Sequence, residues 1–191
     1  MRILGIDPGL RCTGWGVIAC DDGSLRHIAN GTIQPKPNIA DANRLGIIFT
    51  ELDDVIAQYK PNKAAIEQIF VAKSADSALR LGMARGVGLL VCGANGLPVG
   101  EISARAVKKA VAGTGTAEKK QVQEMVTRLL AVTAKNADAA DALAIAIAVS
   151  NDAGKLADVR VGSGKGEAAG KLSAAIAAAL ARDDTSNGGK T

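Results

Sequence analysis

The chain has 191 residues, enough for one domain with a buried core, and its 48% hydrophobic content argues against global disorder. Three cysteines with no CxxC or Cys/His cluster exclude a disulfide framework and a zinc site, and they fit a reducing compartment. The net charge of +4 identifies no partner by itself, so its distribution along the chain matters more.

We expect a cytoplasmic protein with no membrane association. The N-terminus begins directly with a strand pattern, without a charged leader and an apolar signal region. The longest apolar stretch is interrupted by Arg80 and Arg85, so we expect no membrane-spanning segment.

The first third of the chain predicts three strands and a helix. Residues 2–7, 13–20 and 25–33 are strand-like and are separated by Pro-Gly and Asp-Asp-Gly turn signals. Apolar residues then recur at helical spacing over residues 41–59, where Pro-Asn stops the pattern.

Strands and helices alternate in the next part. Residues 63–70 form a short, mostly apolar run that is consistent with a buried strand. Ser74 is a good N-cap for a helix that ends at the Asn-Gly of residues 95–96. A strand over 98–103 and a helix over 104–113 follow.

The last ordered part is helical. We expect a helix from about Ala117 to Ala131 with these residues facing inward: Val122, Met125, Val126, Leu129 and Leu130. Asn136 caps a final helix over residues 137–149. The elements together predict a mixed α/β sheet with helices on its faces.

This pattern predicts a folded domain followed by a flexible tail. Residues 1–150 form the domain, and residues 151–191 form a Gly/Ala-rich C-terminal tail. The tail contains one marginal helical stretch, with Leu172, Ile176 and Leu180 as its apolar anchors, and we expect it to be largely flexible, without a catalytic role.

Four carboxylates are candidates for a metal site. Asp7 lies at a strand tip, Glu67 interrupts a buried strand, and Asp138 and Asp141 share one face of the final helix. Each has an ordinary alternative role: Asp7 could brace the Pro-Gly turn, Glu67 could pair with a buried arginine, and the helix pair could favour the helix N-terminus.

Taken together, the four carboxylates favour metal binding. Parallel pairing of the first strand with the strand of Glu67 would bring Asp7 and Glu67 side by side at one sheet edge. Converging carboxylates repel unless a cation neutralises them, and hard oxygen ligands suit Mg²⁺ or Mn²⁺. Two such ions about 4 Å apart would activate water and stabilise the leaving oxygen of a phosphodiester. The single histidine, His27, is interpreted as structural.

Five motifs in order carry a family resemblance that covers the chain from its first residues to about Ser150. They are GIDPG with TGWG, AIEQIF, AKSADSALRLGMARG, VKKAVAGTGTAEKKQVQ and NADAADALAIAI. With this spacing the chain resembles the RuvC family of bacterial Holliday junction resolvases. The resemblance implies a ribonuclease-H-like fold with a mixed five-stranded sheet and helices on both faces.

The resemblance also implies an activity and a set of site residues. A homodimer of this family makes paired nicks in a four-way DNA junction. The expected cofactor is Mg²⁺, for which Mn²⁺ can substitute, with two ions in each active site. The family's acidic tetrad falls on Asp7, Glu67, Asp138 and Asp141. The branch-migration proteins RuvA and RuvB are the implied protein partners.

Several residues are candidates for DNA contact. Between Arg105 and Lys135 there are seven basic residues and two acidic ones, which indicates a surface for a polyanion or, equally, solvated helix faces. The family's important lysines correspond to Lys108 and Lys119, which flank a GTGT loop whose glycines permit close approach to phosphate.

An aromatic ring follows the candidate centre. Phe70 comes three residues after Glu67, and it could be a core residue or could stack on an unpaired base at the junction. The resemblance favours stacking. Lys73 lies nearby in the sequence and is predicted to meet phosphate.

The helix that begins after Ser74 is apolar around most of its circumference, which predicts burial on nearly all sides. Its small residues would let another helix come close. A single sheet can cover only one side of this helix, so we expect a dimer contact on the other side. A twofold dimer would place two metal centres on opposing strands of a junction.

Three other readings remain open on the residues. An ATP-binding protein of the actin and sugar-kinase type also begins with a strand and a GID-x-G turn, but it needs two such domains. A ribosomal-RNA-processing nuclease and a non-catalytic junction-binding protein would keep the same fold. A junction-nicking assay separates the last of these from the enzyme.

Overall fold

The computed structural model describes residues 1–68 and 74–150. The predicted tail, Phe70 and Lys73 therefore lie outside the described residues. The described elements are β1 (Arg2–Asp7), β2 (Thr13–Asp21), β3 (Ser24–Ile33), α1 (Asp41–Tyr59), β4 (Lys63–Glu67), α2 (Ala75–Ala94), β5 (Val99–Ile102), α3 (Ala104–Ala112), α4 (Lys119–Leu130) and α5 (Ala137–Ser150). All ten match a predicted element in type and order.

The five strands form one mixed sheet in the order β3-β2-β1-β4-β5. β1 pairs antiparallel with β2, and β2 pairs antiparallel with β3. β1 pairs parallel with β4, and β4 pairs parallel with β5, which confirms the predicted parallel pairing of the first and fourth strands. The carboxyl ends of β1 and β4 consequently lie next to each other at one edge of the sheet.

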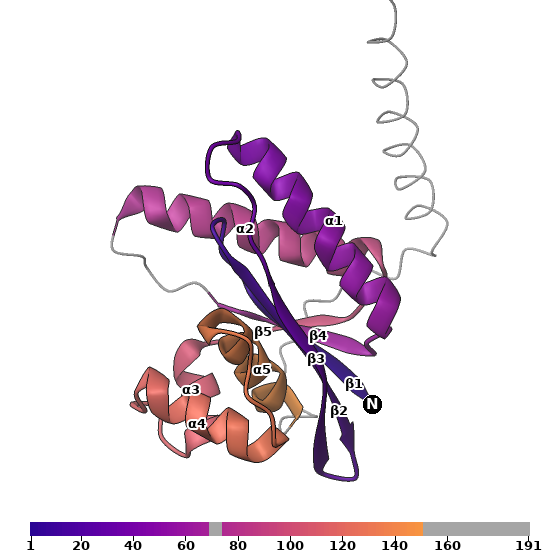
Figure 1. Ribbon diagram of the computed structural model, residues 1–191, viewed down its shortest axis with the longest axis vertical. Helices are drawn as coiled ribbons and strands as arrows, with labels where there is room; N and C mark the ends of the chain where they lie inside the picture. The colour runs from indigo at the N-terminus through magenta and orange to yellow at the C-terminus, as the bar shows by residue number, and fades with distance from the viewer. Residues whose placement is uncertain (69–73, 151–191) are drawn as a thin grey trace, which may run out of the picture.

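Helices cover both faces of this sheet, as Figure 1 shows: α1 and α2 lie on one face, and α3, α4 and α5 lie on the other. Alternation along β1 explains the two layers, since Ile3 packs in the core of α5 whereas Leu4 and Ile6 pack in the core of α1 and α2. β4 alternates in the same way, with Ala65 on the α5 face and Ile66 on the other face.

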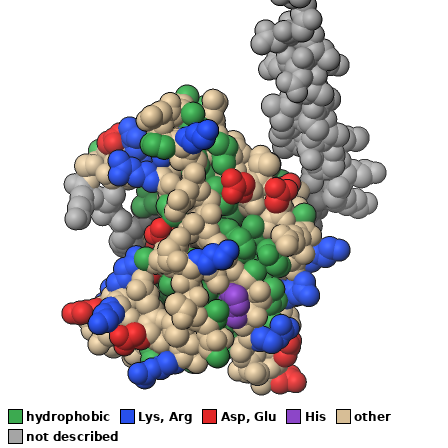
Figure 2. Space-filling model, viewed as in Figure 1, with side chains coloured by type: hydrophobic (Ala, Val, Ile, Leu, Met, Phe, Trp, Pro, Cys, Tyr) green, Lys and Arg blue, Asp and Glu red, His purple; other side chains and the backbone are tan. Residues whose placement is uncertain are grey.

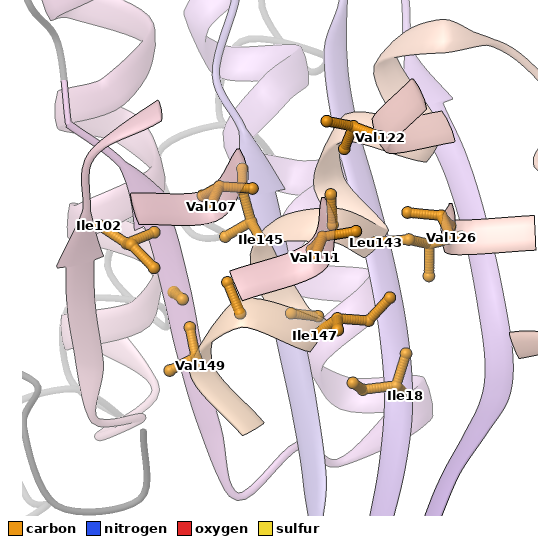
Figure 3. Packing of buried hydrophobic residues seen from close by; sticks show 14 of the residues in the cluster. Ile18, Ile102, Val107, Val111, Val122, Val126, Leu143, Ile145, Ile147 and Val149 are labelled. Atoms are coloured by element: carbon orange, nitrogen blue, oxygen red, sulfur yellow. The ribbon is translucent and has the colours of Figure 1, made fainter. Parts of the chain in front are cut away.

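The core on the α5 face is built around α5 itself, the last and most buried helix. Ten residues of α5 are buried, namely all those from Ala139 to Val149 except Asp141. Its larger side chains meet apolar side chains from α3, α4 and the sheet (Figure 3), among them Val107, Val126 and Ile18. A helix covered on all sides needs no polar face, so the Asp141 carboxylate in it requires a separate explanation.

Several helix ends are set by the capping residues that the sequence indicates. The Ser74 hydroxyl accepts a hydrogen bond from the backbone N–H of Ser77 at 3.2 Å, and α2 starts there. Asn136 caps α5 in the same way through the N–H of Ala139, at 2.9 Å. Both predicted N-caps are confirmed.

In the single chain, α2 is buried only on the side that packs on the sheet. Ala84, Gly88, Val91 and Cys92 are buried, whereas Leu90 is 56% exposed. The expected contact of the other side with a second copy of the chain stays a prediction. One prediction about burial is wrong: on α4, Leu129 is 41% exposed and does not face inward, although its neighbour Leu130 does.

The sequence predicted that Arg80 and Arg85 leave no apolar stretch of membrane-spanning length. By length and composition alone, however, α2 is long and apolar enough to cross a membrane. In the structure α2 packs on the sheet: a Cβ at Gly88 would lie 2.8 Å from the Cδ1 atom of Ile66. The glycine allows the helix to approach the strand closely.

Candidate active site

Two of the four candidate carboxylates lie on adjacent strand ends and on the same face of the sheet. Asp7 is the last residue of β1 and follows Ile3 at an even spacing, and Glu67 is the last residue of β4 and follows Ala65 by two. Because Ile3 and Ala65 both face α5, Asp7 and Glu67 point to that face too. Ligands of open α/β sheets commonly bind at the carboxyl ends of central strands.

The other two carboxylates come from the first turns of α5, on the face that meets the sheet. Asp138 and Asp141 are three residues apart and are half-buried. The Asn136 side chain fixes the start of this helix, since it caps α5 and also donates to the Thr32 hydroxyl of β3 at 3.1 Å. The local sequence therefore holds α5 against the sheet at the place where its acidic residues begin.

Two glycines allow α5 to approach the strands this closely. A Cβ at Gly14 of β2 would lie 2.1 Å from the backbone oxygen of Asp138, and a Cβ at Gly5 of β1 would lie 2.0 Å from that of Ala142. Both distances are far below van der Waals contact, so a side chain at either position would push α5 away. This role was not predicted from the sequence, although both glycines belong to the motifs GIDPG and TGWG.

The resulting cluster has the dimensions of a cation site. One carboxylate oxygen from each of Asp7, Asp138 and Asp141 lies within 4.8 Å of the others. Glu67 is not in this group of three, but it lines the same pocket of about 260 Å³ with Asp7 and Asp141. The predicted convergence of all four carboxylates is thus tight for three of them and looser for Glu67.

The electrostatics of the cluster show mutual repulsion in a partly desolvated place. Burial, followed by the charges of Glu67, Asp141 and Asp138, raises the pKa of Asp7 from 3.8 to about 7. Burial and the Asp141 charge raise the pKa of Glu67 as well. Such carboxylates are poorly stabilised as anions by the protein itself and would gain from a bound cation.

Two lysines lie beside the carboxylates. Lys119, the first residue of α4, places its Nζ atom 2.5 Å from Oδ2 of Asp141. Lys108 of α3 is half-buried and lines the same pocket. Lys108 and Lys119 both oppose the rise in the pKa of Glu67. The two predicted DNA-contacting lysines are therefore brought to the carboxylates.

The ordinary roles considered for two of the carboxylates are taken by other residues. The Pro-Gly turn after Asp7 is braced by Thr13, whose hydroxyl donates to the Gly9 carbonyl oxygen at 2.8 Å. The buried arginine, Arg44, pairs with Asp41, and the half-buried Arg85 pairs with Glu101, so neither of them pairs with Glu67. Asp7 and Glu67 thus have no such structural role among the described residues.

The glycines of the GTGT loop have a local structural role. Gly113 ends α3 with a φ of 79°, and a Cβ at Gly115 would lie 2.6 Å from the Cγ atom of Arg105. The expected approach of this loop to phosphate stays a prediction. On the face in view in Figure 2, basic side chains are interspersed with acidic ones and do not form one continuous patch.

The arrangement of strands and carboxylates defines a class of protein. A five-stranded mixed sheet in this order, with helices on both faces, is the fold of the ribonuclease-H-like nucleases, and in this chain acidic residues lie at the central strand ends and on the last helix. Solved structures agree. RuvC of Thermus thermophilus in complex with a Holliday junction substrate superposes with a TM-score of 0.73 at 31% identity, covering 78% of this chain and 92% of that one. The yeast mitochondrial Holliday junction resolvase Ydc2, at 14% identity and a TM-score of 0.58, shares the fold.

Sequence comparison gives the family. The profile of the crossover junction endodeoxyribonuclease RuvC matches residues 3–149. RuvC of Paramagnetospirillum magneticum is 53% identical over 148 residues, which are 77% of this chain and 89% of that protein. RuvC of Klebsiella pneumoniae is 47% identical over 168 residues, which are 86% and 96% of the two chains. The chain belongs to the RuvC family of crossover junction endodeoxyribonucleases.

Proposed function

We propose that this chain is a structure-selective endodeoxyribonuclease that resolves four-way DNA junctions by paired, symmetric, metal-dependent hydrolysis during recombination and repair. The observation that carries the proposal is the group of carboxylates from Asp7, Asp138 and Asp141 within 4.8 Å, in a chain of this family. Hydrolysis at this site would leave 5′-phosphate and 3′-hydroxyl ends.

The donor set fits Mg²⁺, with Mn²⁺ as a substitute. All candidate ligands are carboxylate oxygens, which hard divalent cations prefer, and no histidine or thiolate is in the group. Asp7, Asp138 and Asp141 would hold one ion, and Glu67 with Asp7 would complete a second position. When bound, such ions supply a water of lowered pKa and neutralise charge on the phosphodiester oxygens.

The residues of this chain then divide the remaining work. Asp7 would orient the ligand set, since it ends β1, a strand that is held between β2 and β4 in the sheet. Lys108 and Lys119 border the carboxylates and would bind the phosphates on either side of the cleaved bond. The half-buried setting of the site limits competing water and strengthens these charge interactions.

Further contacts are proposed from the sequence and the family. Phe70 would stack on an unpaired base at the junction, and Lys73 would meet phosphate. The proposed location is the cytoplasm, and RuvA and RuvB are the proposed partners.

A homodimer is also part of the proposal. It would form through α2, where Leu79 is 65% exposed and Leu90 is 56% exposed. Leu90 also borders an apolar groove against α1, with Leu45 and Phe49 on its other side. Burying such large side chains would stabilise a dimer, because exposed apolar patches commonly mark interfaces.

Incubation with a synthetic four-way junction and with a linear duplex, each with and without Mg²⁺, tests the proposal. We expect symmetric nicks only in the junction and only with Mg²⁺. Tight binding of the junction without any nicking would instead indicate a non-catalytic junction-binding protein. Equal cleavage of linear duplex would contradict structure selectivity.

A further inference from the structure

The ion pair between Lys119 and Asp141 puts a protein cation on one of the candidate metal ligands. The Lys119 Nζ atom lies 2.5 Å from Oδ2 of Asp141. The Lys119 side chain is 58% exposed and that of Asp141 is 27% exposed, so the pair lies at the mouth of the site. The hydrogen bond to Asp141 raises the pKa of Lys119, and the charges of Asp141, Asp138 and Asp7 raise it further.

The position of Lys119 in its helix is unfavourable unless the lysine has a partner. Lys119 is the first residue of α4, where the positive end of the helix dipole disfavours a cation. The helix start is held by other groups, since the Gln121 side chain accepts a hydrogen bond from the Glu118 N–H at 2.9 Å. Lys119 therefore does not cap the helix, and its ammonium group instead forms the ion pair with Asp141.

The strength of the pair suits displacement. A partly exposed ion pair contributes little to stability, because water and salt screen it. A divalent cation would interact with several carboxylates at once, whereas the ammonium group makes a direct ion pair with Asp141 alone. A cation can thus replace the ammonium group at low cost.

We propose that Lys119 is a built-in counter-ion, which occupies Asp141 in the cation-free protein and is displaced when a divalent cation binds, so that its ammonium group becomes available to a DNA phosphate. This inference rests on the proposed function, because it needs the cation site. It assigns Lys119 a second role, as a competitor of the metal. Loading of the cation and binding of DNA would then favour each other, since each draws on a different partner of the same ion pair.

Cation affinity of the free protein tests this role without any measurement of cleavage. Mn²⁺ binding is titrated by electron paramagnetic resonance for the full chain and for Lys119→Met, Lys119→Arg and Lys120→Met. Lys120 is the adjacent exposed lysine and has no ion pair in the described part of the chain, so its variant controls for loss of one charge. Thermal melting of each variant checks folding.

We expect Lys119→Met to bind Mn²⁺ roughly two- to fivefold more tightly, which corresponds to the removal of one partly exposed pair. Lys120→Met should change affinity clearly less, and Lys119→Arg should stay close to the native chain because it keeps a cation at Asp141. Unchanged affinity in Lys119→Met, or an equal gain in Lys120→Met, would overturn the inference.

A second measurement follows the ammonium group in the native chain, and a variant serves only to assign its signal. Lysine ammonium signals of the native chain are recorded by ¹H–¹⁵N nuclear magnetic resonance with and without Mg²⁺, and the signal that is missing in Lys119→Arg is assigned to Lys119. The Lys119 signal should be protected from exchange without Mg²⁺ and become mobile with it. If the native chain binds no divalent cation, the proposed function is contradicted as well. If the chain binds the cation and nicks the junction while the Lys119 signal stays equally protected with Mg²⁺, only this inference is overturned.

Discussion

Gly14 and Asp138 are in such close approach that a single added carbon at Gly14 would lie 2.1 Å from the backbone oxygen of Asp138. Gly14 is also the antiparallel partner of Asp7 in the β1–β2 ladder. The same glycine therefore lies across from one candidate ligand and makes room for another. The distance between strand and helix at this point decides whether the carboxylates can share an ion.

Replacing Gly14 by alanine should separate these ligands. We expect Gly14→Ala to lower the free energy of unfolding by about 1–3 kcal/mol, because α5 must shift to accommodate the methyl group. Nicking should fall roughly 100-fold, since small displacements of reacting groups are costly. The control is Gly93→Ala in α2, where a Cβ would meet nothing within 4 Å. That variant should lose no stability and keep its activity.

Asp7→Asn should separate junction binding from cleavage. The amide keeps the shape of the side chain and removes the charge that a divalent cation needs. We expect junction affinity in a gel-shift assay to stay within about threefold of the native value, because contacts to phosphate supply most of it. Nicking with Mg²⁺ should fall below detection. Nicking at a near-native rate would mean that the reaction centre lies elsewhere.

The stability of the cation-free protein should depend on pH through Asp7. The pKa of this carboxyl is raised from 3.8 to about 7, so between these values the folded protein holds a proton that the unfolded chain has released. The free energy of unfolding contributed by Asp7 therefore falls as pH rises from about 4 to about 7 and is constant above that range.

Comparison with the Asn variant isolates this effect. We expect Asp7→Asn to be more stable than the native chain at pH 8 by about 1–3 kcal/mol, and the difference to shrink towards pH 4. Urea denaturation at several pH values, without divalent cations, measures it. Saturating Mg²⁺ at pH 8 should reverse the order, because only the native ligand set gains from the ion.

The exposed leucines of α2 should hold a dimer together. We expect Leu90→Glu to shift the protein to a monomer, since two carboxylates would be buried at a twofold contact. Analytical ultracentrifugation measures the change. Leu129→Glu is the matched control, because Leu129 is 41% exposed but lies on α4. A monomeric native chain, or equal dissociation of both variants, would argue against a dimer through α2.

Lys108 should contribute to DNA binding through its charge. We expect Lys108→Gln to weaken junction binding several-fold and to lower the slope of log affinity against log salt concentration by roughly 0.9. The control is Lys60→Gln, since Lys60 precedes β4 at the opposite end of the sheet from Glu67. Fluorescence anisotropy over a range of salt concentrations distinguishes the two variants.

Much of the fold could be read from local patterns. The alternation in β1, the helical spacing in α1 and the caps at Ser74 and Asn136 each depend on a few neighbouring residues, and each was confirmed. Patterns of this kind reflect backbone and solvent preferences that act at short range. They failed for Leu129 of α4, because helical spacing alone does not show how wide a strip of the helix its neighbours cover.

The candidate site was predictable in its members and not in its spacing. Asp7 and Glu67 stood out because a carboxylate at or in a buried strand is costly, and Asp138 with Asp141 because they share a helix face. Their sequence separations say nothing of distance. The ion pair of Lys119 with Asp141 could not be foreseen, because it joins two separate helices whose relative placement depends on tertiary packing.

By itself the sequence determined the strands, the helices, the family and the set of acidic residues, since these follow from the periodicity of apolar residues and from motifs of neighbouring residues. Only the tertiary structure decided that oxygens of three carboxylates lie within 4.8 Å of one another while Glu67 lies outside this group. It also decided that Lys119 forms an ion pair with one of the three, Asp141. The physical reason is that these distances depend on how closely α5 packs on β1 and β2. That packing is set by contacts between segments more than a hundred residues apart, at glycines whose importance lies in the side chains they lack.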